Sequence, residues 1–283
     1  MNRRDFLKKF TGSILAGIGV ASGSFYYAHQ MEPTMLEVKR EKIISSKIPP
    51  AFHQFRIIQF SDTHIGFHYS LEQLEELVHK VNNLNPHIIV FTGDLVDKPN
   101  EYKNYEQLSA ILSMLKADYG KYWIYGNHDH GGYGTDLIKN VMERANFSLL
   151  QNNLQVIEKD FDRLNIAGID DVMLGKPDLY KTLQNANPNL YTILLAHEPD
   201  FVEETINYPV DLQLSGHSHG GQIRLPFVGH IYTPDYAEKY VKGKYDIGSQ
   251  LTLFVNSGIG TTRLPYRFLC SPEIHIYTLF SKI

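Results

Sequence analysis

Five short polar clusters contain residues that can bind metal ions or transfer protons. Carboxylate, imidazole and amide groups suit divalent metals such as Mn, Fe or Zn. The chain has one cysteine, Cys270, so a zinc site built from several thiolates is excluded. The clusters are Asp62-Thr63-His64, Gly93-Asp94, Gly126-Asn127-His128-Asp129, His197 and Gly216-His217-Ser218-His219.

The spacing within two clusters supports a shared metal. Side chains on an extended segment return to the same face at every second residue. Asp62 and His64 can therefore reach one ion together, and the same holds for His217 and His219. We interpret most of the other histidines as ordinary core or surface residues, and leave His68 and His130 undecided.

Each cluster follows a stretch with the apolar and β-branched composition of a strand. We predict these strands at residues 55–60, 87–92, 122–125, 191–196 and 210–214. In open α/β proteins, sites gather at the carboxyl ends of the strands. The five clusters are therefore expected to meet in one site.

Helical patterns separate the first strands. A helix is predicted at residues 71–83, where Ser70 and Gln73 fit a capping box. A second is predicted at 105–116, and a loop at 126–134 leads to a third. Beyond Phe147 we expect short strands near residues 149, 156, 164–169, 222–225, 251–255 and 273–280, with one helix at 178–186. At 283 residues and 43% hydrophobic, the chain can form one large α/β domain.

The N-terminus has the pattern of an export signal. Paired arginines, Arg3 and Arg4, precede an uncharged run at residues 10–28 that is rich in Gly, Ala and Ser. The Arg-Arg-x-Phe-Leu-Lys pattern resembles the twin-arginine signal. We expect residues 1–30 to be a twin-arginine export signal or signal anchor, with the twin-arginine export machinery as a partner. Residues 31–51 would be a linker or edge strand, and residues 52–283 the catalytic domain.

Charge and motifs limit the partners. A net charge of -4 gives no general attraction to nucleic acid, so no nucleic acid is expected. The chain lacks the Gly-x-x-x-x-Gly-Lys-Ser/Thr phosphate loop. Four cations could supply local positive charge for a phosphate, although each such residue is more often an ordinary surface charge: Lys98, Arg224, Arg263 and Arg267.

Taken together, the clusters resemble those of the calcineurin-like metallophosphoesterases in order and approximate spacing. The resemblance runs from about residue 55 to the C-terminus. With the twin-arginine-like start, the chain is similar to the exported bacterial branch of that family. The resemblance implies a four-layer α/β/β/α sandwich, in which two mixed β-sheets pack face to face between helices and hold two divalent metal ions.

The same resemblance implies a role for each site residue. It assigns the first metal to Asp62, His64 and His219, and the second to Asn127, His197 and His217. Asp94 would bridge the two ions. Two such ions polarise phosphoryl oxygens and lower the pKa of a bridging water.

A further residue of the third cluster, His128, is not assigned to a metal. In the family the corresponding histidine protonates the leaving oxygen, a task that suits an imidazole near neutral pH. Asp97 resembles the aspartate that orients this histidine, and Asp129 is the alternative.

We therefore expect a metal-dependent phosphoesterase, acting as a phosphodiesterase on a small-molecule or envelope phosphate ester. The alternatives are a phosphomonoesterase, a nuclease, or a non-catalytic metal-binding scaffold. Residues 226–232 and 264–269 mix aromatic, apolar and basic character. They could line a groove for a lipid head group or wall polymer, consistent with membrane or cell-wall association, or they could be packed loops.

Overall fold

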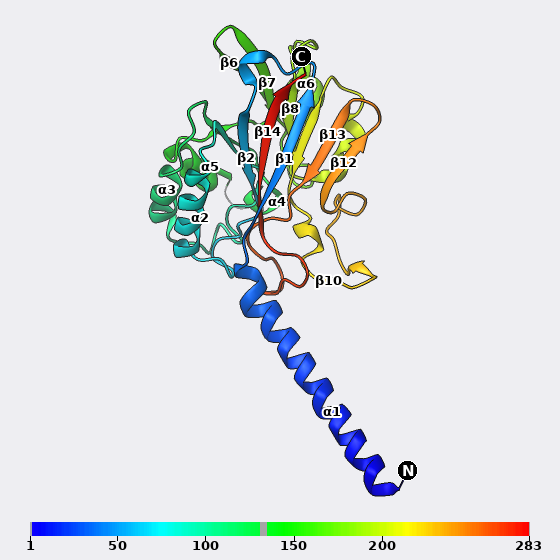
Figure 1. Cartoon of the computed structure of the whole chain (residues 1–283). Coiled ribbons are helices and arrows are strands. Elements are labelled where there is room, and N and C mark those ends of the chain that lie inside the picture. Colours follow the sequence, from blue (N-terminus) through cyan, green and yellow to red (C-terminus); the bar gives the residue numbers. More distant parts are fainter. Residues whose placement is uncertain (1, 131–134, 283) are drawn as a thin grey trace.

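The computed structural model describes residues 2–130 and 135–282 (Figure 1). Residues 131–134, which complete the predicted 126–134 loop, lie outside this part, as does Met1 of the predicted signal. Two six-stranded mixed sheets form the centre of the molecule. They carry the predicted α/β architecture, and helices cover their outer faces.

The first sheet has the strand order β1-β14-β2-β3-β4-β5. Strands β2 to β5 run parallel, β14 is antiparallel to β2, and β1 pairs in parallel with β14 at the edge. The strands of this sheet are β1 (Glu37–Ser45), β2 (Phe55–Phe60), β3 (Ile88–Phe91), β4 (Lys121–Trp123), β5 (Ser148–Leu149) and β14 (Glu273–Ser281).

The second sheet has the order β12-β13-β9-β8-β7-β6. Its four central strands run parallel, and an antiparallel strand lies at each edge. A separate two-stranded ribbon pairs β10 (Arg224–Leu225) with β11 (Gly229–His230). The strands of the second sheet are β6 (Asn153–Lys159), β7 (Asp162–Gly168), β8 (Thr192–Leu195), β9 (Leu212–Ser215), β12 (Gly243–Ile247) and β13 (Leu251–Val255).

Three apolar cores hold these layers together. The middle core lies between the sheets and combines side chains such as Val90 and Tyr277 of the first with Leu195 and Leu214 of the second. Both strand faces are covered, which explains why the predicted strands are almost continuously apolar. Burying one such side chain contributes about 1.5 to 3 kcal/mol.

Helices close the outer faces. On the first sheet these are α2 (Leu71–Asn83), α3 (Tyr105–Ser113) and α5 (Thr135–Arg144). The predicted capping box is present, because Ser70 and Gln73 exchange side-chain and backbone hydrogen bonds. The second sheet is covered by α6 (Leu179–Leu183) and by the segment that includes α7 (Val202–Thr205).

The N-terminal helix α1 (Arg3–Tyr26) has no buried residue and projects away from the domain (Figure 1). Among the described residues, no helix is both long and apolar enough to cross a membrane. The chain then turns at Tyr27–Met31 and enters β1, which occupies the stretch between the predicted signal and the predicted domain.

Candidate metal centre

All five predicted clusters begin within three residues of the carboxyl ends of β2, β3, β4, β8 and β9. The backbone bends sharply there. Five predicted metal ligands adopt left-handed conformations with φ between 43° and 66°, namely Asp62, His64, Asp94, His217 and His219. Such conformations are uncommon outside glycine and concentrate at functional sites. The turns aim these side chains into one region between the sheets.

Glycines make room for this convergence. A Cβ atom on Gly126 would lie 2.3 Å from Asp94 Oδ1, and one on Gly216 would lie 2.5 Å from Asp62 Oδ2. Both distances are far below van der Waals contact. The glycines of the clusters are therefore needed for the close approach of backbone and carboxylate.

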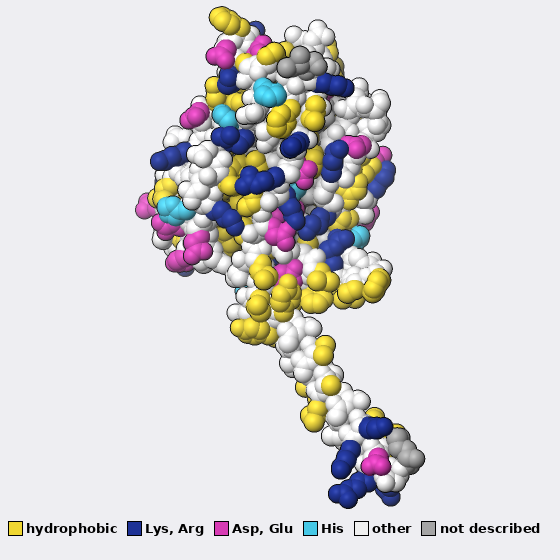
Figure 2. All heavy atoms as spheres, in the orientation of Figure 1, with side chains coloured by type: hydrophobic (Ala, Val, Ile, Leu, Met, Phe, Trp, Pro, Cys, Tyr) yellow, Lys and Arg dark blue, Asp and Glu magenta, His cyan; other side chains and the backbone are white. Residues whose placement is uncertain are grey.

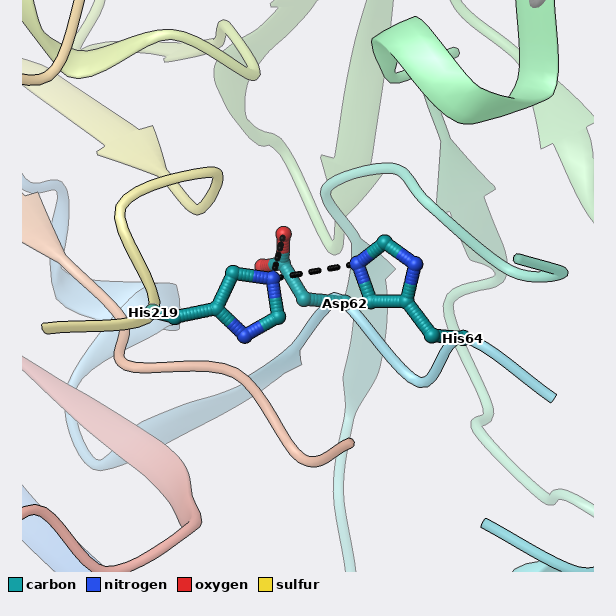
Figure 3. A group of neighbouring side chains, drawn as sticks. All are labelled: Asp62, His64 and His219. Carbon is teal, nitrogen blue, oxygen red and sulfur yellow. Dashed lines mark hydrogen bonds and ion pairs between the residues drawn. The ribbon is translucent and has the colours of Figure 1, made fainter. Parts of the chain in front are cut away.

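Asp62, His64 and His219 form one ligand set (Figure 3). The Nε2 atoms of the two histidines lie 3.0 Å apart, and His219 Nε2 is 3.6 Å from Asp62 Oδ1. All three side chains are buried. Burial and the neighbouring His64 lower the pKa of His219 well below its usual range, so this ring stays neutral, the form that binds metals.

Asp94, His197 and His217 form a second set. His217 Nδ1 and His197 Nε2 are 3.2 Å apart. The outer nitrogens of both rings bond to backbone carbonyls: His197 Nδ1 to Thr92 at 2.6 Å, and His217 Nε2 to Asp235 at 2.9 Å. These bonds turn the inner nitrogens toward the centre, as second-sphere partners do in metal sites.

Asp94, a member of the second set, also lies close to the first. Its Oδ2 atom is 3.6 Å from His64 Nε2 and 3.3 Å from His197 Nε2. Burial opposes ionisation, yet the facing imidazoles of His197 and His128 hold the pKa of Asp94 well below its usual range. Conversely, although burial acts in the other direction, Asp94 and Asp62 raise the pKa of His197. The cluster therefore attracts positive charge.

The residues present fit divalent metal ions. The donors are carboxylates, imidazoles and one amide, with no thiolate among them. The amide belongs to Asn127, which begins the short helix α4 (Asn127–His130) within the predicted 126–134 loop. Its Oδ1 atom is buried and has no hydrogen-bond partner among the described residues. A buried amide oxygen without a partner is costly unless it has a ligand.

His128 lies at the rim of this cluster, with its side chain 30% exposed. Its Nδ1 atom is 2.8 Å from the backbone carbonyl of Asp97 and 3.7 Å from the Asp97 carboxylate. The same carboxylate is 3.4 Å from His64 Nδ1. Burial works against the charged form, but Asp94 and Asp97 raise the pKa of His128. Asp97 thus contacts both a predicted ligand and the predicted acid.

Asp129, the alternative orienting residue, has a different position. Its carboxylate accepts backbone N–H groups from Asp94 at 2.8 Å, Leu95 at 3.0 Å and Gly126 at 3.0 Å. Burial and the charge of Asp94 raise the pKa of Asp129 to about 7, although the three donors favour the ionised form. Asp129 therefore joins the turns after β3 and β4.

Of the four candidate phosphate-binding cations, Arg267 must be corrected. Its guanidinium is completely buried and donates to the carbonyls of Ser257, Gly258, Gly260 and Cys270. It therefore supports the 257–260 loop, which packs against Asp62, and cannot meet a ligand. Arg263, by contrast, is exposed beside the cluster.

A cavity of about 90 Å³ opens onto the two ligand sets. Its lining includes Asn127, His128 and Arg263, Tyr232 from the predicted groove segment 226–232, and Met173, which the sequence did not suggest. These come from loops far away in the chain. The cavity gives a small anionic group access to the predicted ligands.

A pair of residues at the end of β7 was not predicted from the sequence. Asp170 Oδ1 lies 2.7 Å from Nε2 of His130, whose role the sequence alone does not decide. Asp170 and the buried Asp171 directly follow this strand, so the strand-end rule that found the other clusters could have included them.

Comparison with known proteins gives one family and several bacterial relatives. A profile described as "Calcineurin-like phosphoesterase" matches residues 55–221. An uncharacterized metallophosphoesterase of Bacillus subtilis (strain 168), YkuE, is 46% identical over 282 residues, which cover 99% of this chain and 98% of the relative.

Two further relatives have more specific names. Phosphodiesterase YaeI of Escherichia coli (strain K12) is 29% identical, and the match covers 99% of both chains. The UDP-2,3-diacylglucosamine pyrophosphatase LpxG of Chlamydia trachomatis (serovar D) is 27% identical over 93% of this chain and 95% of the relative.

Proposed function

The chain belongs to the calcineurin-like phosphoesterase family and is a hydrolase of phosphoester bonds, and from this premise we propose that it is an exported phosphodiesterase of the bacterial cell envelope. One observation carries the chemical part of the proposal. Two sets of buried carboxylate and imidazole donors adjoin each other, with Asp94 of the second set also close to His64 of the first, beneath a cavity whose rim holds His128.

The metal ions of this site would polarise the phosphoryl oxygens and activate a water for attack. The protein's own residues hold and orient the other groups. Asp94 lies within reach of both ligand sets, and Thr92 and Asp235 fix the rings of His197 and His217. The inner nitrogens of these two rings therefore face the centre of the site, beneath the cavity where the phosphate would enter.

His128 has the position of a general acid, at the rim of the cavity over the ligand sets. Burial works against the charged ring, but Asp94 and Asp97 raise its pKa, which favours the protonated form. The Asp97 carbonyl accepts from Nδ1 and so fixes the ring. His128 would then give a proton to the leaving oxygen, as acids do in hydrolysis.

The names of two relatives support a substrate with phosphate substituted on both sides. YaeI is called a phosphodiesterase, and LpxG a pyrophosphatase acting on a diacylated sugar nucleotide. The test is a substrate panel on full-length protein loaded in turn with Mn, Fe or Zn. We expect hydrolysis of bis-p-nitrophenyl phosphate to exceed that of p-nitrophenyl phosphate. Activity on the monoester alone would overturn the diester assignment.

Export rests on the N-terminal pattern. Arg3 and Arg4 begin the exposed helix α1, which projects from the folded domain and so leaves the arginine pair accessible to an export receptor. The test replaces both arginines with lysine and locates the protein in cell fractions of a bacterium with a twin-arginine system. We expect the variant to accumulate in the cytoplasm. Unchanged export of this variant would contradict the twin-arginine route.

A further inference from the structure

Resting on the proposed function, we propose that the substrate carries a long hydrocarbon chain and that an apolar groove beside the metal centre holds this chain. The groove has a volume of about 470 Å³, within the range of small-molecule sites. Its walls include Ile223, Ile231, Tyr232, Pro234 and Leu264.

The groove continues directly from the metal centre. The groove and the cavity over the ligand sets are both lined by His219, Tyr232, Pro234, Thr262 and Arg263. A phosphate placed at the metal ligands would therefore have one ester substituent at the groove entrance. No separate binding event is needed to bring the chain there.

A positively charged side chain, Arg263, lies where the cavity over the ligand sets meets the apolar groove. The Arg263 guanidinium carbon lies 4.7 Å from the centre of the Tyr232 ring, within the range of a cation–π contact. Among the described residues, no carboxylate lies within ion-pair distance of it. A positive group at the entrance suits a phosphate, and the apolar walls beyond it suit what the phosphate carries.

The walls offer little to a polar substituent. The side-chain amide of Gln222 already donates to the carbonyls of Thr262 and Leu264 and accepts from the Thr262 N–H. A sugar or polyol would lose its water hydrogen bonds in the groove without replacement. A hydrocarbon chain has no hydrogen bonds to water to lose, and its binding removes apolar surface from water.

The rim of the groove is unusually apolar for a surface. Ile231 is 61% exposed and Leu264 is 52% exposed, while Phe227 on the loop between β10 and β11 is fully exposed. Figure 2 shows hydrophobic side chains gathered at this end of the domain, where α1 leaves it. Contiguous exposed apolar patches mark binding surfaces. A chain lying along the groove would cover this rim.

The test compares alkyl p-nitrophenyl phosphodiesters that differ only in the alkyl group, from ethyl through butyl and hexyl to octyl. The substrates are kept below micelle-forming concentrations, and the full-length metal-loaded protein is used. We expect kcat/KM to rise about threefold for each added methylene group until the groove is filled. A p-nitrophenyl diester of uridine serves as the polar and aromatic comparison.

Variants localise the effect. Ile231→Ser should abolish most of the dependence on chain length while hydrolysis of the ethyl ester stays near wild type. The matched control is Ile44→Ser, because Ile44 is equally exposed, at 64%, on the edge strand β1, and this variant should behave as wild type.

Binding gives a readout that does not depend on turnover. Titration calorimetry of the metal-loaded protein should show tighter binding of the non-hydrolysable octylphosphonate than of ethylphosphonate, with a negative heat-capacity change, and Ile231→Ser should remove the difference. Rates independent of alkyl length, or a preference for the uridine diester, would overturn the hydrocarbon site and leave the phosphodiesterase standing. Failure to hydrolyse any diester, the ethyl ester included, would overturn both.

Discussion

The carboxylate of Asp129 accepts the backbone N–H of Asp94 at 2.8 Å, and so fixes a residue of the second ligand set that also lies close to the first. We expect Asp129→Asn to weaken metal binding by about 10- to 100-fold, because an amide cannot accept from all the donors that the carboxylate serves. Metal content after dialysis against graded chelator measures this. Asp136→Asn, an exposed aspartate on α5, is the control. Equal metal retention in both variants would remove Asp129 from the site.

Replacement of Asp94 itself should be more severe. Asp94→Asn keeps the size of the side chain but removes the charge that both ligand sets face. We expect metal content and hydrolysis of bis-p-nitrophenyl phosphate to be lost together. Elemental analysis of the purified variant, paired with its rate, tests this. A metal-free variant with the wild-type rate would contradict a metal-dependent mechanism.

His128→Ala should separate catalysis from metal binding. The ring is at the cavity rim and belongs to neither of the two ligand sets, although it forms a third group with His64 and Asp97. Its removal takes away a proton donor and leaves the residues of the two sets in place. We expect kcat to fall by about two orders of magnitude with unchanged metal content. His79→Ala on the exposed face of α2 is the control. If the His128 variant lost its metal instead, this residue would be a ligand.

Glu273 provides a stability prediction with a defined pH dependence. Its carboxylate is 3.1 Å from His275, 3.7 Å from Lys242 and accepts the Ser257 N–H at 2.8 Å. Burial opposes ionisation, but the bond and charge of His275, with Lys242 and the Ser257 N–H, lower the pKa of Glu273 to about 2. Because the folded pKa is below the unfolded value, Glu273 stabilises the fold above about pH 4.5, and this contribution is lost as the pH falls toward 2.

We therefore expect Glu273→Gln to lower the free energy of unfolding by about 2 to 3 kcal/mol at neutral pH. The deficit relative to wild type should shrink as the pH drops below 4.5. Urea unfolding across this pH range measures it. Glu75→Gln on the exposed side of α2 should show no such trend. A deficit that is constant with pH would mean that packing, and not the charge, is responsible.

Arg267 gives a prediction about the support of the site. Arg267→Lys keeps one positive charge but cannot reach the four carbonyls that the guanidinium holds. We expect the free energy of unfolding to fall by about 2 to 4 kcal/mol. Thermal or urea denaturation measures this change. Arg144→Lys, on the exposed surface of α5, is the control. Wild-type stability of the Arg267 variant would contradict the structural role.

The parts of the fold that were predictable are those with a local signal. The strands β2, β3, β8, β9 and β14 and the helix α2 have continuous apolar runs or a capping box, and they lie within a residue or two of their expected positions. Helix α6 is shorter than predicted, and β11 and β12 were not predicted at all. These short edge elements depend on pairing with distant segments, which leaves little trace in composition.

The site shows the same division. Residue types and strand-end positions were enough to predict that the five polar clusters, with Asp62, His64 and His197 among their residues, meet in one site. The bonds from His197 to the Thr92 carbonyl and from His217 to the Asp235 carbonyl use backbone atoms, and no residue type reveals those. Arg267 could not be recognised as buried from the sequence. A guanidinium is buried where backbone carbonyls surround it, and their positions are set by the fold.

The start of the domain is tied to the loop that supports the site. Arg267 N–H donates to the carbonyl of Ala28, and the buried Glu32 carboxylate accepts the N–H groups of Leu269 and Cys270. If the export signal that we propose is removed, a cut that keeps these contacts lies before Ala28, within α1. The new N-terminus would then be a short helical stub, and the first ordered residues of the mature enzyme would belong to the support of its metal centre.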